Sequence, residues 1–127
     1  MSQFTEELPT SDHTYEFEKL YMWALGSKND AVMAPASAEI LGSELATIEH
    51  GISARYYRSD QVGDVIREIS KARYCLKAIS KGLEASKTDS KSNFYFEAHI
   101  DSLKQTYDGI VEVCKGINAE FKQGASH

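Results

Sequence analysis

Apolar residues recur at intervals of three and four along most of this chain. That spacing places side chains on one face of an α-helix, because a helix turns once in about 3.6 residues. Three long repeats are present, over residues 35–58, 60–85 and 92–122, and they predict three long amphipathic helices. Their core positions are Ala38, Leu41, Leu45, Ile48 and Ile52 in the first, Val62, Val65, Ile69, Ala72, Leu76, Ile79 and Leu83 in the second, and Phe96, Ile100, Leu103, Tyr107, Ile110, Cys114, Ile117 and Phe121 in the third.

A shorter repeat precedes these three and predicts a helix over residues 12–25. Its apolar positions are Phe17, Leu20, Tyr21, Ala24 and Leu25. Asp12 offers an oxygen that caps a helix N-terminus, and Gly26 suits the residue that follows a helix. The polar stretch 26–30 is expected to be a loop. Pro35 is expected to begin the next helix, since proline has no N–H to donate inside one.

These elements predict an all-α fold, an antiparallel up-and-down helical bundle with one short and three long helices. A chain of 127 residues fits one domain, which is expected over residues 11–122. Residues 1–10 lack periodicity, so they are expected to form a flexible arm that Phe4 or Leu8 tacks onto the bundle. Residues 123–127 are expected to be a C-terminal tail.

The short first helix covers only about half the length of the others, so part of the fourth side of the bundle is left open. A second copy of the chain would fill it, and a homodimer is one expectation. The candidate contact residues on the last helix are Gly109, Val113 and Gly116. The two glycines lie two turns apart beside the core stripe. Each glycine inside a helix costs about 1 kcal/mol relative to alanine. Two of them on one side of the helix therefore indicate that another helix approaches closely there.

Composition and charge narrow the possible functions. The formal net charge of -5 and the pI near 5.3 give a mildly acidic surface that repels nucleic acid. No apolar run approaches the roughly 20 residues needed to cross a bilayer, and no signal-peptide pattern opens the chain. Cys75 and Cys114 are expected about 20 Å apart along antiparallel helices, too far for a disulfide. A cytoplasmic protein with no nucleic-acid and no membrane partner is expected.

The chain lacks the residue clusters that catalysis or a cofactor requires. The eight glycines are scattered singly and form no phosphate-binding loop. A Glu-x-x-His pair, the usual metal motif of carboxylate-rich bundles, is missing as well. His50 is expected on the surface and His99 at the edge of the core, while His13 has no evident companion. No catalytic residue, metal or cofactor is expected, and therefore no enzyme.

The surroundings of His50 invite one comparison. With Gly51 and Ser53 nearby, His50 is similar to the exposed mid-helix histidine of histidine phosphotransfer domains, which are also helical bundles of about this size. The resemblance implies a phosphorelay role. Those domains carry a lysine after the histidine, and this chain lacks it, which argues against that role.

The most distinctive surface segment is Arg55, Tyr56, Tyr57 and Arg58. Tyr74 also falls outside its core stripe. Tyrosine and arginine are enriched at binding hot spots, because they bury a large area and keep a polar group available. The sequence therefore predicts a small regulatory protein that binds another protein through these five residues, as an inhibitor, immunity protein, adaptor or chaperone.

A bundle that binds a small molecule or nucleotide is the alternative. Tyr107 lies on the core stripe, so its hydroxyl needs a partner, and a polar pocket lined by Tyr56 and Tyr107 would supply one. An enclosed polar cavity around Tyr107 would favour this alternative. A packed interior beneath an exposed surface of tyrosine and arginine would favour a protein partner.

Overall fold

The structure, a computed structural model, describes residues 7–56, 60–85 and 96–125. Within these ranges the chain forms four helices and no strand, as the periodicity predicts. The helices are α1 (Thr14–Ala24), α2 (Lys28–Tyr56), α3 (Asp60–Ala85) and α4 (Glu97–Ala125). The all-α bundle of one short and three long helices is confirmed.

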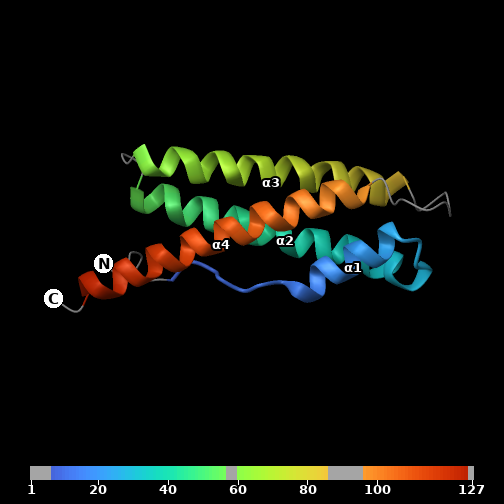
Figure 1. Cartoon of the computed structure of the whole chain (residues 1–127), viewed down its shortest axis with the longest axis horizontal. Helices are drawn as coiled ribbons and strands as arrows, with labels where there is room; N and C mark the ends of the chain where they lie inside the picture. The colour runs from blue at the N-terminus through green and yellow to red at the C-terminus, as the bar shows by residue number, and fades with distance from the viewer. Residues whose placement is uncertain (1–6, 57–59, 86–95, 126–127) are drawn as a thin grey trace.

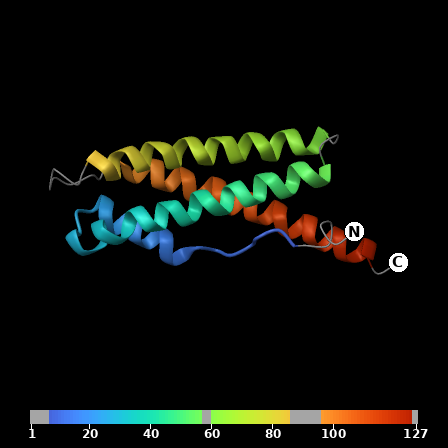
Figure 2. The same cartoon turned by 180° about the vertical axis from the view of Figure 1, so that it is seen from behind.

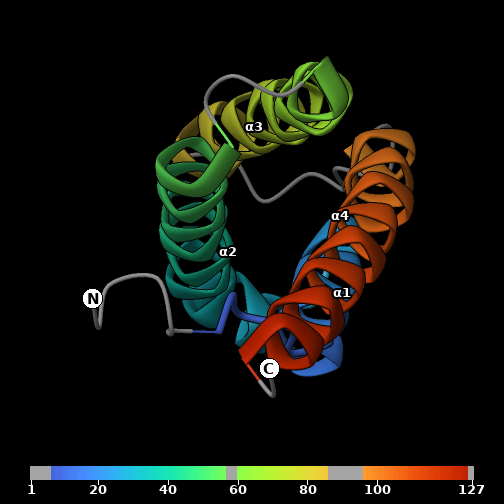
Figure 3. The ribbon, with the colours of Figure 1, turned by 90° about the vertical axis from the view of Figure 1, so that its left-hand side faces the viewer.

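Each helix packs against the next one along the chain, and α1 also contacts α4 (Figures 1 and 2). The four elements therefore surround a common core, as the end-on view in Figure 3 shows. Helix α1 lies along the first half of α2, as Figures 1 and 2 show, and α3 pairs with both α2 and α4. This arrangement lets every apolar stripe face the interior.

The described part of the core follows the predicted stripes closely. The predicted positions that are fully or nearly fully buried are Phe17, Leu20, Ala24, Ala38, Leu41, Leu45, Ile48, Ile52, Val65, Ile69, Ala72, Leu76, Ile79, Leu83, Ile100, Leu103, Tyr107, Ile110 and Cys114. Phe96 and Ile117 are half-buried against them. The side chains of Val62 and Phe121 lie outside the described ones. Leu25 is 62% exposed, so its assignment to the core was wrong.

The predicted start of α2 was wrong by seven residues. The helix begins at Lys28 and contains Pro35 in its interior, although proline was expected to begin it. Tertiary packing explains the difference, because Ala34 and Ser37 are buried on either side of Pro35 and their burial stabilises the helix across the proline. At the other end of the chain α4 continues to Ala125, so most of the predicted tail is helical.

An aromatic contact closes the end of the bundle where α1 turns into α2. Trp23 is 2% exposed, and its ring centroid lies 5.5 Å from that of Phe96 at the start of α4. The ring of Phe96 also faces Gly82 of α3, where an added Cβ would come within 2.5 Å of it. Gly82 therefore leaves the room that an aromatic ring occupies, which accounts for a glycine near the end of a helix.

The fourth side of the bundle is filled beyond α1 by the N-terminal arm. Residues 7–13 run past the start of α1 toward the C-terminal half of α4, as the blue segment of Figure 1 shows. Leu8 is 4% exposed and belongs to the hydrophobic core, so the expectation that it tacks onto the bundle is confirmed. The folded unit therefore extends beyond the boundary predicted at residue 11. A second copy of the chain is not needed to cover this part of the fourth side of the bundle.

Candidate functional site

A polar cluster joins the arm, α2 and α4 at the edge of the core. Its centre is Glu44, whose carboxylate accepts a hydrogen bond from the hydroxyl of Tyr107 and another from His13 Nε2. The second ring nitrogen of His13 lies 3.2 Å from Glu16. His13 and Glu44 are only 11% and 14% exposed in their side chains, so the cluster is largely shielded from water. His13 was predicted to have no companion, and that prediction was wrong.

The two carboxylates raise the pKa of His13 above its ordinary value of 6.5. Burial alone would lower this pKa, but the hydrogen bonds and negative charges of Glu44 and Glu16 outweigh burial. A protonated imidazole donates from both nitrogens, and here each nitrogen faces a carboxylate. The geometry therefore favours the charged ring, which ties the arm to α1 and α2.

This pKa shift predicts a pH dependence of stability. Because the pKa of His13 is higher in the folded chain, its contribution is complete below 6.5 and is lost as the pH rises through the raised folded value. Urea unfolding of the wild type and of His13→Gln, compared at about pH 6 and about pH 8, measures this contribution. We expect the difference between the two chains to shrink at the higher pH. An equal difference at both values would contradict the assignment.

The cluster does not have the geometry of a metal site. Glu16 and Glu44 approach opposite nitrogens of the His13 ring, so the three groups point away from any common centre. Among the described residues no group of three or more histidine, cysteine, aspartate or glutamate side chains is arranged to hold a metal ion.

Tyr107 is packed, not exposed to a polar pocket. Its side chain is completely buried, and the rings of His13 and Phe17 meet it edge-on with centroids 5.6 and 5.7 Å away. Burial, and then the hydrogen bond and charge of Glu44, raise the pKa of Tyr107 far above its ordinary value. The hydroxyl therefore stays protonated and donates to Glu44. The need for a partner that suggested a ligand pocket is met by this carboxylate.

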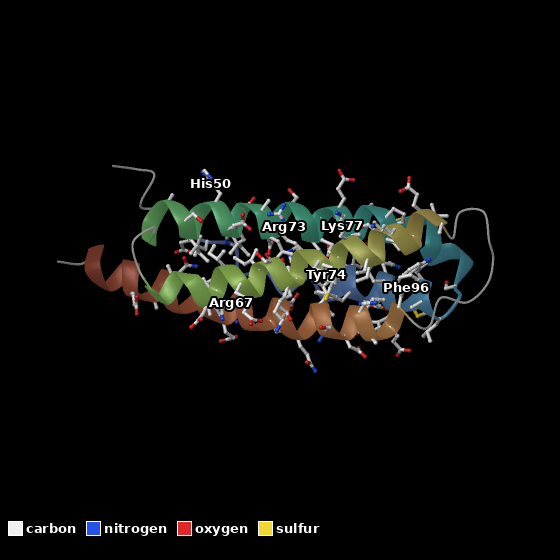
Figure 4. All side chains as sticks on the ribbon, turned by 90° about the horizontal axis from the view of Figure 1, so that it is seen from above. His50, Arg67, Arg73, Tyr74, Lys77 and Phe96 are labelled. Atoms are coloured by element: carbon white, nitrogen blue, oxygen red, sulfur yellow. The ribbon has the colours of Figure 1, made fainter. Side chains whose placement is uncertain are left out.

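A different kind of feature lies on the outer side of α2 and α3. Tyr74 is 73% exposed and borders a groove of about 760 Å³ between the two helices. The α2 wall consists largely of small residues, among them Gly42 and Ser43, and the α3 wall carries Arg73 and Lys77. Figure 4 shows Arg73 and Lys77 on the side of α3 that faces α2. We call this the α2–α3 groove.

The outer surface of α2 continues beyond this groove. A second groove, of about 540 Å³, is bordered by Pro9 of the arm and by Ile40 and Thr47 of α2. Ile40 is 46% exposed and Val32, two turns earlier, is 78% exposed. Helix α2 is thus apolar toward the core and partly apolar on its outer side, unlike a helix that only covers a core.

The structure separates Tyr74 from Tyr56, another of the residues predicted to bind a partner. Tyr74 lies beside Ser43, which is about 20 Å along α2 from Tyr56. Arg55 and Tyr56 end α2, and their side chains lie outside the described ones, as do Tyr57 and Arg58 altogether. Neither Gly42 nor Ile40 was chosen from the sequence, because outward positions of α2 carry no periodic signal.

Charges around the α2–α3 groove are partly paired. Arg73 lies 3.1 Å from Glu49 of α2, a cross-helix ion pair on the surface. Arg67 and Lys71, farther from the groove, pair with acidic residues one turn earlier on α3. Exposed pairs of this kind contribute about 0–1 kcal/mol, so they serve solubility more than stability.

The three residues predicted as an oligomer contact share one exposed side of α4. Val113 is 41% exposed, and a Cβ added at Gly109 or Gly116 would meet no atom within 4 Å. Among the described residues, no other helix comes within 4 Å of a Cβ at these glycines, so their contact with a second copy stays a prediction.

Alanine substitutions at these two glycines test whether anything packs there. Since a Cβ fits freely, Gly109→Ala and Gly116→Ala should each raise the free energy of unfolding by about 0.5–1 kcal/mol through better helix propensity. Thermal unfolding of the purified protein measures this. Gly82→Ala, where the ring of Phe96 fills the space, is the control that should destabilise. A loss at Gly109 or Gly116 would indicate that another chain packs on them.

Two further histidines and both cysteines have the surroundings predicted for them. His50 is exposed on α2, and His99 is half-buried with its ring 6.1 Å from that of Phe96. Gly51, the small residue beside His50, makes room for Leu8 of the arm, which explains it without a phosphorelay partner. Cys75 is half-buried, Cys114 is fully buried, and neither forms a disulfide.

No family model, curated protein or solved structure matches this chain. Over the residues that the structure describes, no helix has the length and apolar character needed to cross a membrane. Function therefore has to be inferred from the surface and the polar cluster themselves.

Proposed function

We propose that this protein acts by binding another protein, and that the α2–α3 groove with Tyr74 is the contact surface. The observation that carries the proposal is the 73% exposure of Tyr74 beside a groove, above an interior whose largest side chains are fully buried. Exposed aromatic residues at a groove are typical of protein interfaces, since they bury much area on association. This chain is proposed to be a small regulatory protein of the inhibitor, immunity-protein, adaptor or chaperone type.

The composition of the groove supports a protein partner over a small molecule. Its α2 wall consists largely of small side chains, which allow a partner helix or loop to approach the backbone closely. Arg73 and Lys77 lie at its edge, where charged groups guide association and set orientation. A small ligand is usually enclosed on most sides, and this groove is open along its length.

Tyr74→Ala is the variant that tests this surface. Immobilised wild-type chain is used to capture a partner from native lysate, and the affinity of that partner is then measured for each variant. Tyr74→Ala is expected to weaken binding at least about tenfold, as truncation of an aromatic hot spot does. The matched control is Tyr15→Ala, because Tyr15 is a tyrosine of α1 that is 54% exposed away from the groove. Equal affinities of the two variants would exclude the α2–α3 groove as the contact.

A further inference from the structure

The contact that holds the arm has the geometry of a peptide-binding site. Asn118 of α4 accepts a hydrogen bond from the backbone N–H of Leu8 at 2.9 Å and donates one to the backbone carbonyl of Leu8 at 3.1 Å. A side-chain amide carries an acceptor and a donor side by side, so it pairs with both backbone groups of one extended residue. Asn118 is only 9% exposed, which shields both bonds from water. Asn118 therefore binds the backbone of the arm.

The side chain of Leu8 provides the second half of the contact. It is 4% exposed and points at Gly51 of α2, where an added Cβ would lie 2.6 Å from one of its methyl groups. Gly51 therefore leaves the space that the leucine fills. Backbone hydrogen bonds together with one apolar pocket are the usual means by which extended peptide segments are recognised. We call Asn118, Gly51 and the space between them the Leu8 site.

The connection between the Leu8 site and α1 is short and open to solvent. Ser11 and Asp12 are exposed, and the backbone turns at His13, which has a left-handed φ of 53°. Such a conformation is uncommon for a residue other than glycine, and here the two carboxylates that face His13 hold it. The bonds that retain Leu8 do not involve α1. An extended segment of another chain would find the same donor, acceptor and pocket.

We propose that the Leu8 site is a docking site for an extended, leucine-containing segment of a partner protein, and that residues 7–10 occupy it as an intramolecular competitor. This goes beyond the function proposed above, because the Leu8 site lies between α2 and α4 and not between α2 and α3. The partner leucine must keep its backbone N–H, because Asn118 binds that group. The attached arm competes at an effective concentration in the millimolar range, so the partner must make additional contacts outside the Leu8 site to displace it.

An NMR titration of the full-length variant Leu8→Ser tests this proposal, because that variant has lost the side chain that occupies the pocket. The probe is an end-capped peptide with the sequence of residues 7–12. Saturable shifts at the amides of Gly51 and Asn118 are expected, with an affinity at least about tenfold higher than for the wild-type chain, whose own arm competes. The same peptide with serine in place of leucine is expected to leave both signals unchanged.

Three results would overturn the proposal. The first is a Leu8→Ser chain that is helical by circular dichroism but shows no saturable shift with the peptide. The second is an equal response from the double variant Leu8→Ser, Asn118→Ala. The third is a wild-type dimer in light scattering that Leu8→Ser abolishes, which would identify the occupant as the arm of a second copy. If Leu8→Ser does not fold, displacement of the arm is measured on the wild type from its Leu8 methyl signals, and no change at excess peptide counts against the proposal.

Discussion

Glu44→Ala is expected to lower the free energy of unfolding by about 2–4 kcal/mol, since it leaves two shielded donors without an acceptor and each such loss costs about 1–3 kcal/mol. Those donors are the hydroxyl of Tyr107, which is completely buried, and Nε2 of His13. Urea unfolding followed by circular dichroism measures the loss.

Two further variants separate the hydrogen bonds from the general effect of removing a glutamate. Glu39→Ala removes an exposed glutamate of the same helix and should change stability by no more than about 0.5 kcal/mol. Glu44→Gln keeps an acceptor for Tyr107 but removes the charge opposite His13, so its loss should fall between the two alanine variants. If Glu44→Ala were as stable as Glu39→Ala, the cluster would have no structural role.

Trp23→Ala is expected to cost about 3–5 kcal/mol, the usual range for deleting a fully buried aromatic side chain. Trp23 is 2% exposed, and it supports the ring of Phe96, which in turn packs over Gly82. Its removal would leave a cavity where α1, α3 and α4 meet. Because this junction closes one end of the bundle, the loss should appear as cooperative unfolding at lower urea concentration.

The neighbouring residue is a suitable control for Trp23. Met22 lies on the same helix and is 39% exposed, so Met22→Ala should change stability by about 0.5 kcal/mol or less. If both substitutions had the same small effect, the contact between Trp23 and Phe96 would not contribute to the core as described.

Periodicity predicted the fold because it depends on local spacing. Leu41, Leu45 and Ile48 each had to face the core once α2 was a helix, and all three are completely buried. The predicted core positions did not include Trp23, although it lies one turn from Leu20. The start of α2 was also missed, because the burial of Ala34 and Ser37 depends on tertiary packing and not on local spacing.

The polar cluster and the Leu8 site were not predictable from spacing. His13 and Glu44 are 31 positions apart, and Leu8 and Asn118 are 110 positions apart. Contacts between residues so far apart in the sequence form only when the helices are assembled, and no repeat along the chain predicts them. One local signal was available, since a tyrosine on a core stripe needs a hydrogen-bond partner. That reasoning identified Tyr107, but it pointed to a pocket where the structure has Glu44.

The location of the partner on the surface is the central claim, and methyl NMR tests it most directly. Leu76 of α3 and Val113 of α4 suit this comparison, because Leu76 lines the α2–α3 groove and Val113 is 41% exposed on a different helix. In a complex with the captured partner, saturation transferred from partner protons is expected to reduce the Leu76 methyl signals and to leave those of Val113 unchanged. Reduced signals at Val113 with Leu76 unaffected would contradict the claim and would place recognition on the outer side of α4.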